Sequence, residues 1–362
     1  MRFPRAEVLV ATTWECNLCC SYCFVREQGL SAEGGRMSRE LAARVITALD
    51  TGLADVEAIC VHLYGGEPLL NLPAIEAMVE QSRRLAPGRV TFTITTNGTC
   101  ASPAAVDLLA RGGFQIILSI DGPAAVHDEC RRTLAGQPTH ARALAFLEAL
   151  RARTDCWVRA SAVVRSGWRL EQAVRYLRSL PVAAIKAQAV RGPEGAPHLL
   201  SAEEQAAYLK DLDAVGQQVI EELQAGREPR DDRFSSRVLQ LLAGIRRTSF
   251  CGAGLTTFGI TPVGDILPCV LMDASDCRLG HVDDGPPRWR AAGRRWRRAR
   301  PHRPECATCS AQPLCGGGCP ALMPVCGADE CDVIRKNCEV AERIYAHFRS
   351  SPERLLALAG IR

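Results

Sequence analysis

The feature that most constrains this chain is a C-x3-C-x2-C spacing directly after an apolar run. Cys16, Cys20 and Cys23 lie in one short loop, and residues 7–13 before it predict a strand. A 4Fe–4S cluster is usually held by four protein thiolates, so a loop with three leaves one iron open to a small-molecule ligand. The spacing therefore predicts a cluster with a reactive iron at the carboxyl end of a strand.

The number of cysteines favours metal binding over disulfides. The 362-residue chain contains 18 cysteines, and nine of them follow Cys251. No basic segment leads into an apolar signal core, and no apolar run has the length of a membrane span. Thiols stay reduced in the cytoplasm, so dense cysteines there indicate metal. We expect a cytoplasmic protein without a membrane partner, and the net charge of +4 identifies no partner by itself.

Apolar segments alternate with helical patterns over the first half of the chain. The predicted strands are residues 7–13, 56–64, 90–95, 114–120, 156–164 and 182–190, and the predicted helices are residues 38–50, 73–85, 103–111, 140–151 and 169–179. A charged segment, residues 121–138, interrupts this alternation. Buried parallel strands joined by helices define an α/β fold with right-handed crossovers, and the periodicity allows an open sheet or a barrel.

The cysteine loop, with Tyr22 directly before Cys23, resembles the signature loop of radical S-adenosylmethionine (SAM) enzymes. The resemblance implies a partial (β/α)6 TIM-like barrel with its active site at the carboxyl ends of the strands. It also implies a 4Fe–4S cluster on Cys16, Cys20 and Cys23, with SAM on the open iron. The implied reaction is reductive cleavage of SAM to methionine and a 5′-deoxyadenosyl radical, which takes a hydrogen atom from the substrate.

A second segment resembles the GGE motif of the same family. Gly65, Gly66, Glu67 and Pro68 follow the predicted strand 56–64, one βα unit after the cysteine loop. In the family, the glycines let the backbone approach SAM and the carboxylate faces its ammonium, an interaction that suits Glu67. Taken alone, this tetrapeptide is a common turn.

Three further residues are candidates for contacts with SAM. Asn97, in the segment 95–98, and Ser119, in the segment 119–123, resemble family residues near the ribose and the substrate. Both segments also read as ordinary N-G and D-G turns. Arg159 lies inside a predicted strand, where a buried cation needs a partner. That partner is either the SAM carboxylate or a structural carboxylate.

The C-terminal third resembles the seven-cysteine SPASM domain, which holds two auxiliary 4Fe–4S clusters. The resemblance begins with Cys251 and with Gly264, which Cys269 follows five residues later. A C-x2-C-x5-C-x3-C run comes next, formed by Cys306, Cys309, Cys315 and Cys319. The candidates for the late cysteine are Cys331 and Cys338. It implies that Cys251, Cys269 and Cys319 serve the first auxiliary cluster. The second would use Cys306, Cys309, Cys315 and a late cysteine.

Two ligands are ambiguous. The late ligand is either Cys338, which has the better distance from Cys319, or Cys331, which better resembles the residue that opens the final helix. The fourth ligand of the first auxiliary cluster is Cys277, Cys326, the unused late cysteine, or none, which leaves an iron open to substrate. Zinc is the competing metal because C-x2-C pairs also build zinc sites, but zinc sites group their ligands in fours. We expect Cys19 to be no ligand.

The domain organisation follows from these segments. We expect a radical SAM barrel over residues 1–192, a helical linker over 193–250, a SPASM domain over 251–345 and a polar tail over 346–362. The SPASM segment shows little periodic structure before a closing helix at 332–347, as expected where metal replaces a core. Residues 288–303 carry eight arginines and two tryptophans, and we interpret them as a solvated helix packed through its tryptophans, without a nucleic-acid partner.

The function implied by the resemblance is radical modification of a ribosomally made peptide, forming a thioether or a carbon crosslink. Alternatives are dehydrogenation of a small alcohol, formylglycine formation in a sulfatase, and a non-catalytic multi-cluster electron carrier. The first predicted strand begins at residue 7, so we expect no fused leader-binding domain. A peptide substrate would then need a separate leader-binding protein or direct docking. A flavodoxin-type or ferredoxin-type reductant is the expected electron donor.

Overall fold

The structure is a computed structural model that describes residues 3–27, 29–30, 35–272, 277–300, 303–324, 326 and 328–358. Its contacts divide the chain into two compact units, each built from separate stretches of sequence. Unit 1 comprises Met1–Ser119, His127–Val158 and Gly252–Pro301, and unit 2 comprises Ile120–Val126, Arg159–Cys251 and His302–Arg362. The domain boundaries expected from the sequence stay a prediction, because these units interleave along the chain.

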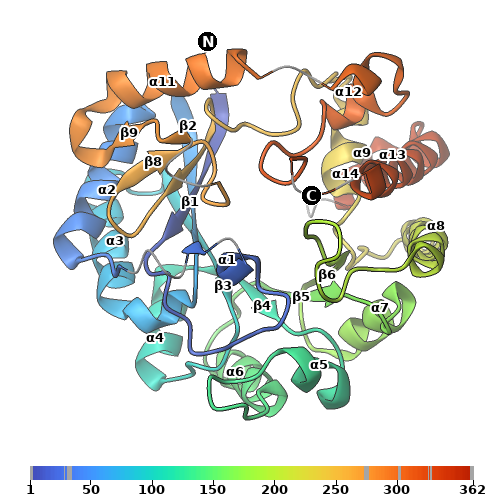
Figure 1. Cartoon of the computed structure of the whole chain (residues 1–362), viewed down its shortest axis with the longest axis horizontal. Coiled ribbons are helices and arrows are strands. Elements are labelled where there is room, and N and C mark those ends of the chain that lie inside the picture. Colours follow the sequence, from blue (N-terminus) through green and yellow to red (C-terminus); the bar gives the residue numbers. More distant parts are fainter. Residues whose placement is uncertain are drawn as a thin grey trace. The chain divides into compact units, whose positions relative to one another are not determined.

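Unit 1 is a sheet with helices on one side of its first strands (Figure 1). Its strands, in spatial order, are β4 (Gln115–Ser119), β3 (Val90–Thr96), β2 (Val56–Tyr64), β1 (Phe3–Ala11), β7 (Thr257–Ile260), β8 (Asp265–Leu267) and β9 (Gly280–His281). Its helices are α1 (Phe24–Glu27), α2 (Arg39–Gly52), α3 (Leu72–Leu85), α4 (Pro103–Gly112), α6 (His140–Arg153) and α11 (Pro286–Arg298), with short 3-10 turns η2 (Pro68–Asn71) and η3 (Val282–Asp284). Helix α5 (Ala124–Cys130) crosses the boundary between the units.

The strands from β4 to β7 are parallel, and β8 and β9 add antiparallel pairs. The parallel pairing of β7 with β1 places Val8 opposite Phe258. The Cys-rich segment thus contains three short strands, residues 257–260, 265–267 and 280–281, that the sequence did not predict. These strands are only two to four residues long, which is too short for an alternating pattern to be recognised.

Helix starts follow ordinary capping chemistry. Ser38 accepts a hydrogen bond from the Leu41 N–H at 3.1 Å and caps α2. Ser102 caps α4 in the same way, and Pro103 occupies its first turn, where a missing N–H costs no hydrogen bond. These signals explain why the predicted and observed starts of both helices agree within one residue.

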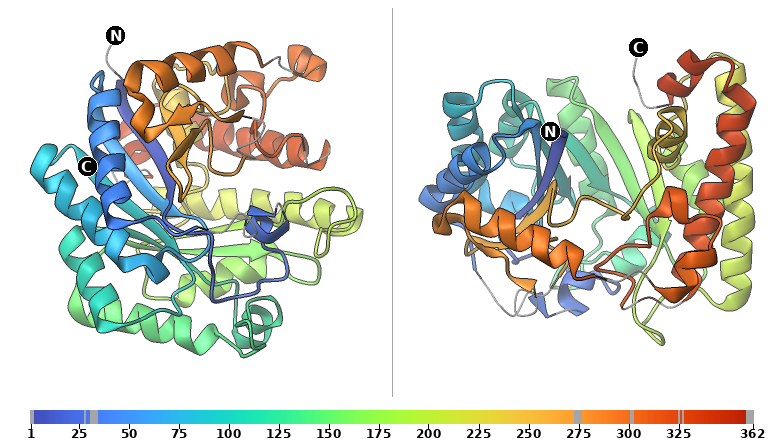
Figure 2. Two further views of the ribbon diagram at one scale, coloured as in Figure 1. Left: turned by 60° about the vertical axis from the view of Figure 1, so that its left-hand side comes forward. Right: turned by 90° about the horizontal axis from the view of Figure 1, so that it is seen from above.

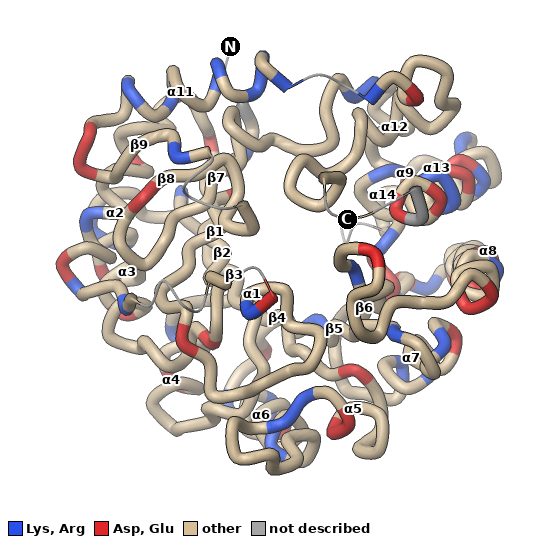
Figure 3. Tube along the Cα trace, in the orientation of Figure 1, with Lys and Arg blue, Asp and Glu red and all other residues tan. Residues whose placement is uncertain are grey.

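The arginine-rich helix α11 packs on unit 1 through Trp289. This side chain is fully buried and lies edge-on to Phe258, with ring centroids 4.9 Å apart. Gly52 makes the packing possible, because a Cβ there would lie 2.2 Å from the indole. Figure 3 shows the basic positions along α11. Arg288, Arg294, Arg295 and Arg298 are exposed, whereas Arg290 is buried and pairs with Asp55 at 2.7 Å.

Unit 2 contains the parallel pair β5 (Val158–Val164, from Arg159 on) and β6 (Ala184–Ala189). Its helices are α7 (Leu170–Ser179), α8 (Ala202–Gln224), α9 (Ser235–Leu242), α12 (Gln312–Cys315), α13 (Ala328–Phe348) and α14 (Pro352–Ala357), with the 3-10 turn η4 (Pro304–Thr308). The long helices α8 and α13 lie side by side (Figure 2). Among the described residues, no helix has the length and apolar character needed to cross a membrane.

Candidate functional site

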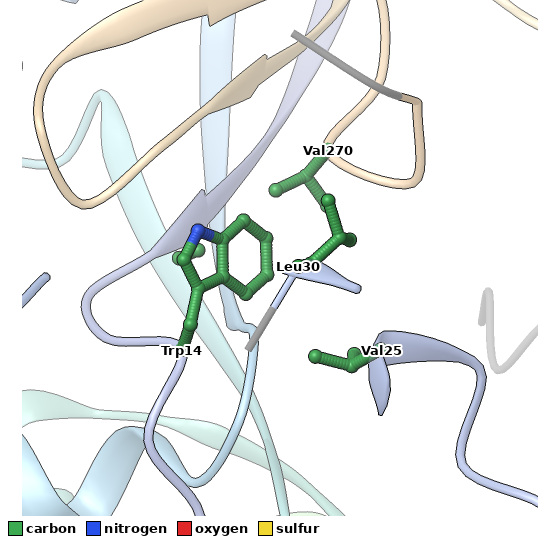
Figure 4. Packing of buried hydrophobic residues seen from close by; sticks show 5 residues of the cluster. Trp14, Val25, Leu30 and Val270 are labelled. Carbon is green, nitrogen blue, oxygen red and sulfur yellow. The ribbon is translucent and has the colours of Figure 1, made fainter. Parts of the chain in front are cut away.

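The cysteine loop begins where β1 ends, as the sequence predicts. Thr12 and Thr13 are fully buried at the carboxyl end of the strand, and α1 follows Cys23. A buried apolar cluster holds the two ends of the loop: Trp14 before it and Val25 after it pack with Leu30 and Val270 (Figure 4). The loop is therefore fixed from both sides by the core of unit 1.

The three candidate ligands of the loop influence one another. Burial is the main reason that the pKa of the Cys16 thiol is raised to about 12, and the nearby Glu67, Cys20 and Cys23 contribute to this rise. The Leu18 N–H donates to Cys16 Sγ at 3.4 Å and opposes this rise. Such a group of thiols in a crowded, poorly solvated loop favours a cation that stabilises their thiolates.

Cys19 faces in another direction. Its thiol donates to the carbonyl oxygen of Thr133 at 3.1 Å, and its backbone N–H donates to the carbonyl oxygen of Arg132 at 2.8 Å. Both contacts join the loop to the segment after α5. Cys19 thus has a protein contact of its own, and its exclusion from the ligands stays a prediction.

Gly65 and Gly66 let the end of β2 contact the cysteine loop at the level of the backbone. The Gly66 N–H donates to Thr13 O at 3.1 Å, and the Glu67 N–H donates to Glu15 O at 2.8 Å. A Cβ on Gly66 would lie 2.0 Å from Glu15 O. Gly65 has φ of +125°, and a Cβ there would lie 2.6 Å from Thr13 O. Only glycine fits both positions.

The Glu67 carboxylate is 1% exposed and connects two strand ends. Its Oε1 accepts hydrogen bonds from Thr96 Oγ1 at 2.8 Å and from the Leu69 N–H at 3.1 Å. Its Oε2 accepts the Asn97 N–H at 2.7 Å. Burial raises the pKa of Glu67 to about 7, and these hydrogen bonds oppose the rise. The adjacent Pro68 begins η2.

Asn97 links this carboxylate to the cysteine loop. Its side-chain amide donates to Asn17 Oδ1 at 3.0 Å and lies 3.8 Å from Cys16 Sγ. Asn17 in turn donates to Thr99 Oγ1 at 2.7 Å. One hydrogen-bonded network therefore joins the ends of β2 and β3 to the cysteine loop.

The sequence analysis missed Arg131. Its guanidinium lies 5.4 Å from the centre of the Tyr22 ring, and both residues are 9% exposed. The preceding Cys130 carbonyl accepts the Ser21 N–H at 3.2 Å, so the backbone itself holds this segment against the loop. Arg131 lies in the charged segment 121–138, which the sequence analysis interpreted only as an interruption of the strand–helix alternation. A single basic residue after a short helix does not indicate a binding role.

Tyr64, also missed, packs with Cys23 against the apolar cluster of Trp14 and Val270. It ends β2 directly before Gly65 and stacks on Phe24, with ring centroids 6.0 Å apart. Burial raises the pKa of Tyr64, and the nearby thiolates of Cys23 and Cys269 add to the rise. The phenol of Tyr64 is thus influenced electrostatically by Cys269 as well as by the cysteine loop.

The structure gives Arg159 a carboxylate partner of its own. Its Nη1 donates to Asp232 Oδ2 at 2.8 Å within unit 2, and both side chains are largely buried. This favours the structural ion pair, one of the two readings that the sequence left open. Ser119 ends β4 in unit 1, and no hydrogen bond joins its side chain to another described residue.

Several C-terminal cysteines gather within unit 2. Cys309 and Cys315 pack against a buried cluster that contains Cys338, Leu314 and Ile334. Burial raises the pKa of Cys315, and Cys306 adds to the rise. No three His, Cys, Asp or Glu side chains among the described residues are grouped closely enough to hold a single metal ion.

The two candidates for the late ligand lie seven residues apart on α13. Cys338 is 1% exposed and belongs to the same buried cluster, whereas Cys331 is only partly buried. Burial raises the pKa of both thiols, and Cys315 adds to the rise for each. Packing therefore favours Cys338. Of the remaining candidates, Cys251 and Cys319 belong to unit 2 and Cys269 to unit 1.

The residues present fit the cofactors that the sequence implies. Unit 1 supplies a crowded three-thiol loop, a glycine backbone at van der Waals distance from it and a guanidinium beside its aromatic residue. Unit 2 supplies a second set of thiols around a buried cluster. These donor sets suit thiolate-bound iron with a polar small molecule at the first site.

A family model described as the radical SAM superfamily matches residues 11–180. Residues 11–180 are a radical SAM domain. The matched segment contains the cysteine loop, the Gly65–Glu67 junction and Asn97. The chain accordingly contains a radical SAM domain, and the 4Fe–4S cluster and SAM are the cofactors of that superfamily.

Two curated relatives extend over nearly the whole chain. A serine-type anaerobic sulfatase-maturating enzyme of Klebsiella aerogenes is 24% identical over 86% of this chain and 78% of that protein. The mycofactocin maturase MftC of Mycobacterium tuberculosis is 26% identical over 91% of this chain and 85% of that protein. Both similarities continue beyond the radical SAM domain.

Solved structures show the same fold. The structure of anSMEcpe with bound AdoMet and the Cp18Cys peptide has a TM-score of 0.76 at 19% identity and covers 99% of this chain and 100% of that chain. Streptococcus suis SuiB bound to its precursor peptide SuiA has a TM-score of 0.62 at 18% identity, over 88% of this chain and 72% of that chain. This likeness confirms the predicted fold class of a radical SAM barrel with a Cys-rich C-terminal region.

Proposed function

We propose that this radical SAM enzyme oxidatively modifies a peptide and that Cys16, Cys20 and Cys23 hold its SAM-cleaving cluster. The observation that carries the proposal is the network in which Glu67 and Asn97 join two strand ends to the Cys16 loop. When bound, the cluster and SAM supply a 5′-deoxyadenosyl radical. The protein supplies the position of that radical and excludes water from it.

Each residue around the cysteine loop contacts a different part of SAM in this proposal. The Gly65–Gly66 backbone leaves room for the ligand, and Glu67 offers a carboxylate to its ammonium while it fixes Thr96 and Asn97. The Arg131 guanidinium beside Tyr22 is placed to pair with the SAM carboxylate. Ser119, without a described hydrogen-bond partner at the end of β4, is available to a ribose hydroxyl.

Two auxiliary 4Fe–4S clusters complete the proposal. Cys306, Cys309, Cys315 and Cys338 serve one of them, a choice supported by the packing of three of these residues around one apolar cluster. For the other, the ligands stay those that the sequence resemblance implies. Because oxidation of a substrate radical releases an electron, an auxiliary cluster gives that electron an acceptor.

A peptide is the substrate that the similarities favour. SuiB is seen with a precursor peptide and anSMEcpe with the Cp18Cys peptide, and MftC is named as a maturase. Formylglycine formation in a sulfatase is the second candidate, because a sulfatase-maturating enzyme is among the relatives. A separate leader-binding protein, a flavodoxin-type or ferredoxin-type reductant and a cytoplasmic location complete the proposal.

The test compares two classes of peptide on one enzyme preparation. The reconstituted, reduced protein is incubated with SAM and one of two peptides. The first is a short precursor-like peptide encoded beside its gene, and the second is a sulfatase peptide with Cys or Ser at the modified position. We expect 5′-deoxyadenosine in both and a mass change in the precursor-like peptide. A mass loss in the sulfatase peptide alone would replace the first candidate by the second. Modification of neither peptide, with SAM still cleaved, would contradict the choice of a peptide.

A further inference from the structure

Lys186 is a partly buried lysine whose ammonium has no partner among the described residues. Only three of the 44 Lys and Arg residues are lysines, namely Lys186, Lys210 and Lys336. Lys336 pairs with Asp213 at 3.2 Å and with Glu339 at 2.8 Å, and Lys210 is exposed on α8. Lys186 is partly buried in the middle of β6, and no hydrogen bond or ion pair joins its ammonium to another described residue.

The register of β5 and β6 shows which face Lys186 occupies. Ala160 and Ala162 on β5 and Ile185 and Ala187 on β6 are buried, on the face of the sheet that α7 covers. Lys186 alternates with them and therefore lies on the opposite face. Its direct partner in the register is Ser161, and the next pair on that face is Val163 with Gln188.

Each of the two neighbouring carboxylates, Asp231 and Asp232, is paired with an arginine. Residues 230–233 run along the other edge of β6, where the Ile185 N–H donates to Arg230 O at 2.7 Å. Asp231 accepts hydrogen bonds from the Arg233 guanidinium at 2.8 Å through both of its oxygens. Asp232 accepts from Arg159 at 2.8 Å. Each carboxylate thus has an arginine partner, although Asp232 Oδ1 is buried without a hydrogen bond among the described residues. Arg159, Arg233 and Lys186 bring three positive charges to two carboxylates, so one positive charge is in surplus.

The hydroxyl of Ser161 and the amide of Gln188 also lack hydrogen-bond partners in the described structure. Three polar side chains with donor groups therefore stand together on one strand pair, one of them a cation. An ammonium and a hydroxyl side by side match the two oxygens of a carboxylate, and a partly desolvated ammonium binds one more strongly than a solvated ammonium does.

We propose that Lys186 and Ser161 form a subsite for a carboxylate of the substrate, either an acidic side chain or the C-terminal carboxylate of a peptide. The proposal rests on the peptide-modifying function and specifies its substrate class as an anionic peptide. Lys186 acts as a binding residue that sets which part of the peptide is presented. Burial lowers the pKa of Lys186 to about 8, with Asp232 and Asp231 opposing this and Arg159 and Arg233 supporting it. Binding should therefore weaken above pH 8, where the ammonium loses its proton.

The scarcity of lysine permits a direct binding test. Reductive methylation with ¹³C-formaldehyde labels the three lysines and the N-terminus of the holoprotein, and Lys186→Arg and Lys210→Arg assign the resonances. The probes are N-acetyl-glutamate amide, N-acetyl-alanine and N-acetyl-alanine amide. We expect the Lys186 resonance alone to shift with one or both carboxylate probes and not with the amide. The responding probe identifies a side-chain or a terminal carboxylate. No shift with any probe, or a shift with SAM alone, would overturn the proposal.

A kinetic test on the modified peptide gives an independent readout. Lys186→Met should raise the KM for the peptide at least about tenfold, the loss expected for a charged hydrogen bond, and leave peptide-independent SAM cleavage unchanged. Lys186→Arg should recover part of the loss, and the matched control Lys210→Met should match the wild type. A fall in SAM cleavage by Lys186→Met, or an unchanged KM, would contradict the subsite. Because the NMR shift needs no turnover, failure of the peptide-modifying function stays distinguishable from failure of this proposal.

Discussion

The backbone N–H of Asn97 donates a 2.7 Å hydrogen bond to Glu67 Oε2, across 30 residues of sequence. Through this contact the end of β3 is fixed to the turn after β2. The side chain of Asn97 then reaches Asn17 and the Cys16 thiol. A single buried carboxylate therefore positions the residues that border the cysteine loop, in addition to any contact with SAM.

The first prediction concerns the pH dependence of stability. Because burial raises the folded-state pKa of Glu67 from 4.5 to about 7, its contribution to stability is fully present below pH 4.5 and is lost as pH rises through 7. Glu67→Gln removes this titration. The unfolding free energy of the variant minus that of the wild type should therefore rise by about 2 kcal/mol from pH 5.5 to pH 8. Denaturant unfolding of the SAM-free protein at several pH values measures it.

Glu80→Gln is the matched control for this prediction, because Glu80 is exposed on α3 and, among the described residues, forms an ion pair with Arg39 alone. It should show no such trend with pH. A difference between Glu67→Gln and the wild type that stays constant with pH would contradict the raised pKa.

The second prediction concerns the close contact between the backbone at Gly66 and the backbone of the cysteine loop at Glu15. Gly66→Ala should destabilise the protein by about 3 kcal/mol, because the new Cβ meets Glu15 O at 2.0 Å. Gly88→Ala is the comparison: Gly88 has φ of +77° but nothing within 4 Å, so only about 1 kcal/mol of backbone strain is expected. Thermal unfolding of both variants checks the order. Equal losses of stability in the two variants would contradict the prediction, because the clash of the new Cβ with Glu15 O would then relax at no cost in stability.

The sequence predicts the framework of unit 1 well and for clear reasons. Strand β2 has the predicted bounds, because an apolar run is bounded by turn residues on both sides. The Cys16 loop and the Gly65–Glu67 turn lie at neighbouring strand ends, because parallel strands bring their carboxyl ends to one edge. The contact between them therefore follows from chain order alone.

Other residues of the site carry no local signal. Arg131 and Tyr64 are recognised only by what lies beside them in space, namely Tyr22 and the thiols of Cys23 and Cys269. The Lys186 subsite depends on a strand register and on ion pairs formed by residues 231–233. The pairing of β7 with β1 depends on a contact between residues about 250 positions apart, which no periodicity in a four-residue strand reveals.

The third prediction separates the two interpretations of Arg159. If its ion pair with Asp232 is structural, Arg159→Met should cost about 2 kcal/mol of stability and leave SAM affinity unchanged. Adding Asp232→Asn to this variant should recover part of the loss, because the buried charge is then no longer unpaired. A SAM affinity reduced tenfold at unchanged stability would instead assign Arg159 to SAM.

The fourth prediction concerns the late auxiliary ligand. With three clusters present, the reconstituted wild type should contain about 12 irons per chain, and Cys338→Ala should lower this to about 8. Cys331→Ala, on the same helix, should leave the content unchanged. Iron and sulfide analysis of the two variants decides between them, and the reverse pattern would assign the ligand to Cys331.

The central claim is that Cys16, Cys20 and Cys23 hold the SAM-cleaving cluster and that Cys19 does not. The most direct measurement is 5′-deoxyadenosine formation by the reduced enzyme with SAM, compared between Cys16→Ala and Cys19→Ala. Cys19 is a close control, because it lies in the same loop with its thiol on the Thr133 carbonyl. We predict that Cys16→Ala abolishes the product and that Cys19→Ala retains most of it. Product formation by Cys16→Ala, or its loss in Cys19→Ala, would contradict the account.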